Sequence, residues 1–268
     1  MGRRVGLLAG GVLALLALGP LLARGYVLTY DMVFVPRLEL TRGLLGLDVA
    51  VARAVPADLL VALASRLVPA DLVQKLVLAG VFVGAAAGAA RLVPARNPVA
   101  RAAAATLYAW NPFLYERLVL GHWGLLVSYA ALPWVARSAL DLRLGTHGAL
   151  RRLVLTLAVA AAGSPPGGLI AALIALCVAI SPPWPSPGAP GYPAAVPRPS
   201  VAARAGMVVG VALVVNAPWL VPSLLRPGGV PVRAEGVEAF AARPDGPLGT
   251  VGSLVGLGGI WNALVVPP

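Results

Sequence analysis

The chain has 268 residues, of which 59% are hydrophobic and 12% are charged, and its formal net charge is +11. Because soluble domains carry about 25% charged residues, this composition excludes an ordinary soluble fold and predicts a polytopic membrane protein. The arginines are scattered between apolar runs, without a basic stripe or interleaved aromatic residues. The positive charge therefore does not indicate nucleic-acid binding.

The apolar runs predict an all-α fold, a polytopic transmembrane helical bundle of about seven spans that forms a single domain over residues 1–268. The expected segments are 5–24, 70–92, 100–115, 124–140, 150–163, 167–181 and 203–224. Several are shorter than the roughly 20 residues that a spanning helix needs. The pairs around 100–140 and 150–181 are therefore also compatible with tilted or partly re-entrant helices.

The distribution of charge predicts the orientation of these spans. With the amino terminus in the cytoplasm, eleven arginines and one acid, Asp141, fall on the cytoplasmic side, against ten basic residues and nine acids outside. This asymmetry follows the positive-inside rule and predicts a multi-pass protein of the plasma membrane. Residues 5–23 favour an uncleaved first helix, because the apolar run is long and a small-x-small cleavage site is missing.

A long first outer loop, residues 25–70, contains two helix starts of one form, Pro56-Ala57-Asp58 and Pro69-Ala70-Asp71. A proline in the first turn with an acid shortly after it suits the free amides and the positive end of a helix. Apolar residues recur at helical spacing after the first start, which predicts a short amphipathic helix in the membrane interface. The second start leads directly into the second membrane helix.

Asp31 lies in the same loop, a few residues beyond the first apolar segment. A carboxylate near lipid is costly and is a candidate functional group. The alternative is an ordinary loop carboxylate that caps a turn or pairs with Arg37.

The second outer element, residues 110–124, concentrates polar side chains between two apolar segments. An aromatic belt at the interface explains its tryptophans. It does not explain Asn111, Glu116, Arg117 and His122 at the same depth. Individually, Glu116 and Arg117 could form a local charge pair and His122 could be an ordinary loop histidine. Together they predict a polar pocket for a headgroup or sugar phosphate, with Arg117 as the phosphate donor.

Two further segments carry no predicted catalytic residue. The proline-rich stretch 181–202 is expected to be an extended cytoplasmic linker. Residues 225–268 are expected to form an outer tail, in which Gly258-Gly259-Ile260-Trp261-Asn262 is either a second outer recognition loop or part of a poorly ordered terminus. The chain stops without a returning helix, which predicts that a carboxyl-terminal part is missing.

The run Asn111-Pro112-Phe113…Tyr115-Glu116-Arg117…Gly121-His122-Trp123-Gly124, together with Asp31 after the first helix, resembles GT-C-type membrane glycosyltransferases. The likeness is to actinobacterial arabinofuranosyl- and mannosyltransferases. It covers most of the chain as topology but only about 30 residues as motif. It implies a polyprenyl-phosphate sugar as donor and an envelope glycan or lipid as acceptor.

On this resemblance Asp31 is the catalytic base. Arg117, with Arg37 as second candidate, binds the leaving phosphate, and His122 and Trp123 contact sugar or acceptor. Asp31 lacks the acidic neighbour that many members carry, so we expect no metal, and no cofactor is implied. The alternative function is a non-enzymatic polytopic membrane protein, a transporter or an envelope-assembly scaffold. The transferase hypothesis requires Asp31, Arg117 and His122 to meet at one outward-facing cavity.

Overall fold

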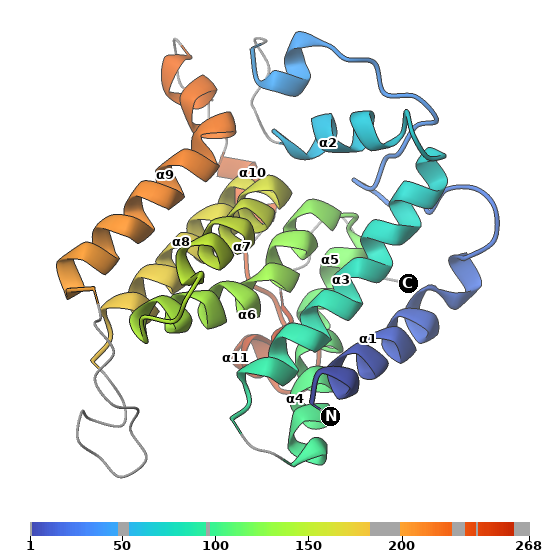
Figure 1. Cartoon of the computed structure of the whole chain (residues 1–268). Helices are drawn as coiled ribbons and strands as arrows, with labels where there is room; N and C mark the ends of the chain where they lie inside the picture. The colour runs from blue at the N-terminus through green and yellow to red at the C-terminus, as the bar shows by residue number, and fades with distance from the viewer. Residues whose placement is uncertain are drawn as a thin grey trace.

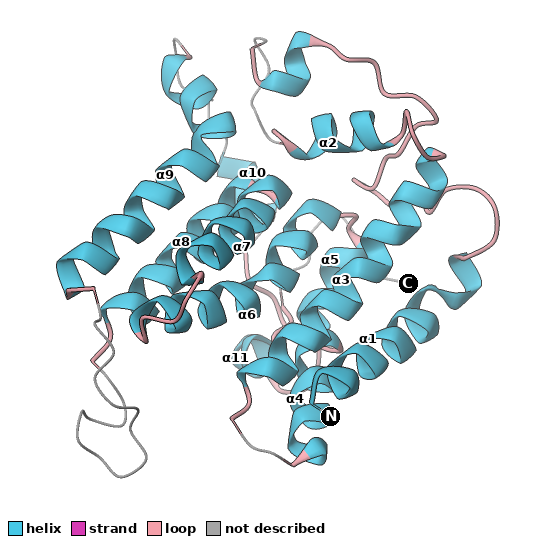
Figure 2. Ribbon diagram, in the orientation of Figure 1, coloured by secondary structure: helices cyan, strands magenta, loops and turns pink. Residues whose placement is uncertain are grey.

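The computed structural model describes residues 2–47, 54–94, 97–182, 199–226, 234–239 and 241–259. Within these ranges the regular secondary structure is helical, apart from one isolated bridge between Thr29 and Met32 (Figure 2). The α-helices are α1 (Gly2–Leu18), α2 (Ala57–Ala64), α3 (Ala70–Leu92), α4 (Pro98–Ala109), α5 (Pro112–Val119), α6 (Trp123–Arg143), α7 (Ala149–Gly163), α8 (Pro165–Ile180), α9 (Val201–Leu225), α10 (Ala234–Ala239) and α11 (Gly249–Val255).

Three of the described helices contain stretches long and apolar enough to cross a membrane, at Arg4–Leu21, Ala70–Leu92 and Val201–Leu225, and α8 is a shorter apolar helix. The prediction of an all-helical membrane protein is thus supported, while the count of seven spans stays a prediction. The segment expected at 100–115 is divided into α4 and α5. Asn111 causes this break, because its side chain caps α5 and Pro112 follows at the first helical position.

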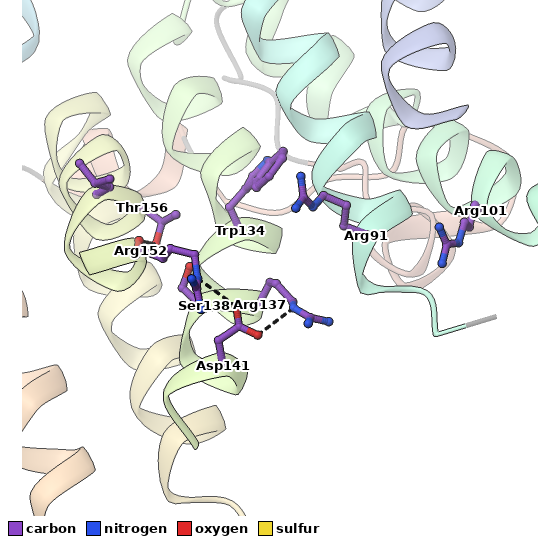
Figure 3. A pocket seen from close by; sticks show the side chains of 9 residues that line it. Arg91, Arg101, Trp134, Arg137, Ser138, Asp141, Arg152 and Thr156 are labelled. Atoms are coloured by element: carbon purple, nitrogen blue, oxygen red, sulfur yellow. Dashed lines mark hydrogen bonds and ion pairs between the residues drawn. The ribbon is translucent and has the colours of Figure 1, made fainter. Parts of the chain in front are cut away.

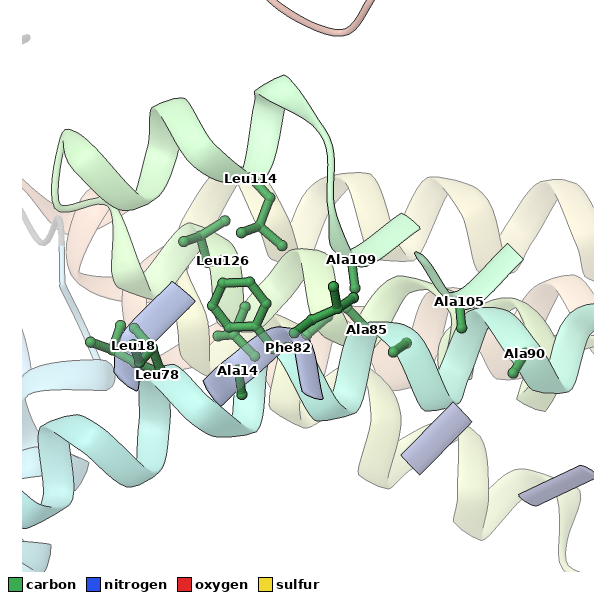
Figure 4. Close-up of a cluster of buried hydrophobic side chains, with 14 of the residues drawn as sticks. Ala14, Leu18, Leu78, Phe82, Ala85, Ala90, Ala105, Ala109, Leu114 and Leu126 are labelled. Carbon is green, nitrogen blue, oxygen red and sulfur yellow. The ribbon is translucent and has the colours of Figure 1, made fainter. Parts of the chain in front are cut away.

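Most of the bundle is organised around α6, which packs against α3 on one side and against α7 and α8 on the other (Figure 1). One apolar cluster joins α1, α3, α4, α5 and α6. Leu18, Leu78, Phe82 and Leu126 are buried in it (Figure 4). A second cluster joins α6 to α7, α8 and α9. Because α6 belongs to both clusters, its two ends are held in fixed positions.

Helices α1 and α3 approach each other closely through two glycines of α1. A Cβ on Gly6 would lie 2.8 Å from the Cα of Ala87, and one on Gly10 would lie 2.6 Å from the Cα of Val83. Small residues four positions apart are a common means of close helix packing in membranes. This contact positions the first helix, from which the loop bearing Asp31 departs.

Candidate active site

The predicted site lies at the amino-terminal end of α6, where the first loop meets the α5–α6 connection. Gln74 of α3 fastens the beginning of this loop. Its buried amide accepts a hydrogen bond from the Val27 backbone N–H (2.8 Å) and donates one to the Val27 carbonyl (2.7 Å). The loop is thereby aligned with the amino-terminal end of α3 before it reaches Asp31.

The following residues alternate between the core and the surface. Met32 and Phe34 are buried in the first apolar cluster, whereas Asp31 and Val33 are exposed. Asp31 lies in a tight turn in which the Met32 N–H donates to the Thr29 carbonyl at 2.6 Å. The two buried side chains therefore anchor the segment, and Asp31 and Val33 face a shared cavity.

Gly121 shapes the other half of the site. It follows α5 with a φ of +83°, and two backbone bonds, from His122 N–H to the Arg117 carbonyl and from Gly121 N–H to the Leu118 carbonyl, close the helix end. This pattern is a Schellman motif, which brings together the side chains of the residues before and after the turn. Arg117 and His122 occupy those two positions.

Gly121 also makes room for the first loop. The Asp31 N–H donates to the Leu120 carbonyl at 3.1 Å. A Cβ on Gly121 would lie 2.1 Å from the backbone nitrogen of Met32. The left-handed conformation and the lack of space both favour glycine here.

Three predicted residues are in direct contact as a result. His122 Nε2 lies 3.1 Å from Asp31 Oδ2, and His122 Nδ1 lies 3.1 Å from Arg117 Nη1. A guanidinium only donates and a carboxylate only accepts, so the neutral imidazole accepts at Nδ1 and donates from Nε2–H to Asp31. The sequence-based expectation that these three side chains meet agrees with this geometry.

Burial lowers the pKa of His122, and the neighbouring Arg117 charge lowers it further, while Asp31 partly opposes both effects. Burial also lowers the pKa of Arg117, and the nearby Glu116 charge counteracts this. Near neutral pH the imidazole is therefore uncharged. Asp31 is held by a neutral N–H donor, and its side chain remains 75% exposed.

The three residues line a cavity of about 960 Å³. Its walls come from the first loop, the start of α2, the α5–α6 connection, the α7–α8 turn and the carboxyl-terminal part of α9. The lining residues from those last two elements include Ser164, Pro165, Trp219 and Ser223. Helices far apart in sequence thus close one chamber beside Asp31.

Asp58 also lines this cavity, and burial raises the pKa of its carboxyl group. Sequence reasoning interpreted Asp58 only as an acid in the first turn of α2, where it indeed lies. The site therefore contains two carboxyl groups in different environments. The available signal was the repeated Pro-Ala-Asp start, which did not reveal which way α2 faces.

The remaining predicted residues are distributed differently. Trp123 lines the cavity and packs against Phe34, with ring centroids 5.3 Å apart. Glu116 is buried, 2% exposed, beside Arg117 in sequence, and it does not line the cavity. Arg37 is exposed and is also absent from the lining.

The Asn111 side-chain amide forms hydrogen bonds that stabilise the local fold. Its oxygen accepts from the Leu114 N–H, and its nitrogen donates to the Tyr108 carbonyl and to the Tyr129 hydroxyl. Asn111 lines a separate apolar cavity of about 590 Å³ between α1 and α5. These contacts explain the residue as a helix cap.

Among the described side chains, no group of three or more His, Cys, Asp and Glu residues could hold a metal ion. The expectation that the site works without a metal stays a prediction.

Comparisons of the chain with protein-family models, with curated proteins and with solved structures gave no match.

Proposed function

We propose that the protein is a membrane glycosyltransferase that transfers a sugar from a polyprenyl-phosphate donor to an envelope glycan or lipid acceptor. The observation that carries this proposal is the Asp31–His122–Arg117 chain at the edge of one large cavity. Transfer requires a base for the acceptor hydroxyl and a cation for the leaving phosphate. The cavity offers both within one hydrogen-bonded unit.

Asp31 is the proposed general base. As the acceptor oxygen forms its bond to the anomeric carbon, its proton passes to the Asp31 carboxylate. The bond between that carbon and the phosphate oxygen breaks, and the lipid phosphate leaves with the electron pair. His122 orients Asp31 through its bond to Oδ2, and the high exposure of the side chain leaves it accessible to an acceptor. A positioned base typically accelerates such a step by about 10²–10⁴-fold.

Arg117 is the proposed partner of the leaving phosphate. A guanidinium has five N–H donors in a planar fork that suits phosphate oxygens. Arg117 lines the cavity and binds His122 through Nη1. Charge that develops on the phosphate would be offset by this cation in a partly buried setting.

We propose the membrane arrangement on independent grounds: seven spans in the plasma membrane, a cytoplasmic amino terminus, and the catalytic cavity on the outer face. The asymmetric arginine distribution supports this orientation. Leu60, Leu63 and Leu67 are exposed on and just after α2, while Ala57 and Ala62 are buried. An apolar outer side on a short helix supports an interfacial position for α2.

The test is a transfer assay in membranes that contain the full chain, with radiolabelled polyprenyl-phosphate mannose and polyprenyl-phosphate arabinofuranose as donors. We expect Asp31→Asn to lower transfer by about 10²–10⁴-fold with unchanged expression, because the amide cannot accept the proton. Glu39→Gln is the matched control, since it removes an exposed carboxylate of the same loop that does not line the cavity.

Full transfer by Asp31→Asn would eliminate the base assignment. Absence of transfer by the wild-type chain from both donors would count against the transferase and favour the non-enzymatic alternative.

A further inference from the structure

The charge of Asp58 is balanced differently from that of Asp141. Asp141 borders a second cavity, of about 630 Å³, at the carboxyl-terminal end of α6, and it pairs with Arg137 and Arg152, each at 3.1 Å (Figure 3). Within the described ranges no ion pair involves Asp58, while burial raises the pKa of its carboxyl group. A carboxyl group in such a position lowers stability, and groups of this kind are typical of functional sites.

The position of Asp58 at the candidate active site is fixed by packing at the start of α2. Val55, just before the helix, is buried against Trp219 in the carboxyl-terminal part of α9. Figure 1 shows α2 and this part of α9 at the same end of the bundle. The Asp58 backbone N–H donates to the Ala54 carbonyl at 2.9 Å. Asp58, Trp219 and Ser223 consequently contribute to one wall of the 960 Å³ cavity.

The side chains of this wall suit the recognition of a sugar. A carboxyl group can accept hydrogen bonds from hydroxyls, and an aromatic ring offers a flat apolar surface. Ser223 donates to the Trp219 carbonyl at 2.7 Å, so its hydroxyl oxygen can still accept. The proposed base and the proposed phosphate partner belong to the first loop and to the α5–α6 connection. The hydroxyl groups of the sugar therefore need partners from another element, and α2 provides a carboxyl group.

We propose that Asp58 is a specificity-determining residue that accepts hydrogen bonds from hydroxyl groups of the transferred sugar. This inference rests on the proposed transferase function and divides recognition of the donor into two parts. Arg117 binds the phosphate, and Asp58 binds the sugar. A site that pairs with a substrate hydroxyl discriminates strongly against a ligand that lacks it, because the protein group then loses its partner.

The experiment measures ligand binding to the full-length protein in detergent by native mass spectrometry, so it does not require transfer. The sugar-bearing probes are polyprenyl-phosphate mannose and polyprenyl-phosphate arabinofuranose. The reference probe is polyprenyl methyl phosphate, a phosphodiester of the same charge that lacks the sugar. Asp58→Ala should weaken binding of the preferred sugar-bearing lipid by about 10–100-fold, the range typical of a hydrogen bond to a charged group. It should leave binding of the methyl phosphate unchanged.

A second variant tests whether the loss reflects misfolding. Asp58→Asn keeps the shape of the side chain and removes a charge that burial disfavours, so its Tm should be no lower than that of the wild type. It should weaken binding of the sugar-bearing lipid by about tenfold. Asp71→Asn is the matched control, because Asp71 occupies the same place in the second Pro-Ala-Asp start and does not line the cavity. It should leave both affinities unchanged.

An equal loss of both kinds of ligand in Asp58→Ala would assign the residue a structural role and overturn the inference, as would undiminished binding of the sugar-bearing lipid. A wild-type chain that binds this lipid through Asp58 but transfers no sugar would count against the proposed transferase function alone. A wild-type chain that transfers sugar, with the same affinities in Asp58→Ala, would refute the role of Asp58 alone.

Discussion

An aspartate lies near each end of α6, Asp31 beside its amino-terminal end and Asp141 near its carboxyl-terminal end, and the two have different partners. At one end the Asp141 side chain is 11% exposed, and an arginine binds each of its oxygens. At the other end the Asp31 side chain is 75% exposed, and its Oδ2 is held by a histidine. Similar residue types therefore form a saturated ion-pair cluster in one place and an accessible carboxylate in the other.

The difference lies in the partner as much as in the exposure. Two guanidinium groups pair with Asp141, one at each of its oxygens, so this carboxylate links α6 to α7. The neutral His122 orients Asp31 without cancelling its charge. A carboxylate held in this way can still act as a base, whereas a doubly paired one contributes to stability.

The largest effect on transfer should come from a substitution that prevents the close contact between the first loop and the residues before α6. Gly121→Ala places a Cβ against the Met32 nitrogen and strains a φ of +83°, so Asp31 should move away from His122. A displacement of about 1 Å can cost about 100-fold in rate. We expect a loss of this size in the transfer assay. Gly11→Ala, at an open position of α1, should leave transfer unchanged; equal activity of both variants would refute the proposed contact.

A smaller effect, on stability, distinguishes the two aspartates directly. Asp141→Asn leaves two arginines without their carboxylate and should cost about 2 kcal/mol, because the pair is only partly buried. Thermal unfolding in detergent should then shift down by about 4–8 °C. Asp31→Asn should shift it by less than about 2 °C, since its carboxylate is exposed. Similar shifts in both variants would contradict the comparison.

The smallest effect concerns pH. The pKa of His122 is lowered by folding, so below about 6.5 the unfolded chain binds a proton that the folded chain does not. This contribution to stability is complete above that pH and is lost as the pH falls towards the lowered pKa. We expect a lower Tm at pH 5.5 than at pH 7.5, with a smaller difference in His122→Gln.

His147→Gln is the matched control for this measurement, because His147 is an exposed histidine outside the cavity. A pH dependence that His122→Gln leaves intact would show that another group causes it.

Much of the local structure could be predicted from the sequence. The two Pro-Ala-Asp starts begin α2 and α3 as expected. Prolines and a capping residue mark the starts of α5 and α8. The proline-rich stretch 181–202 falls largely outside the described residues, so its expected extended conformation stays a prediction. The tail 225–268 is described in part and contains α10 and α11, while its position on the outer side stays a prediction.

The candidate site was only partly predictable. The concentration of Arg117 and His122 within the short segment 110–124 favoured a shared site, whereas the turn at Gly121 that brings them into contact is a finding of the structure. No feature of the sequence indicated that Asp58 of α2 would face the same cavity as Asp31. Helix α2 is short, and its position depends on contacts with distant elements. The side of α2 that faces the cavity can therefore not be derived from the residues of the helix itself.

Composition, charge and turn residues by themselves determined that this is a helical membrane protein with a polar element between two apolar segments and an isolated acid after its first helix. These properties follow from residues and their near neighbours. Only the tertiary structure decided that Asp31 contacts His122, 91 positions away, and that four arginines from four helices line one cavity. Such contacts arise from the packing of the whole bundle, in which small residues set how closely the helices approach.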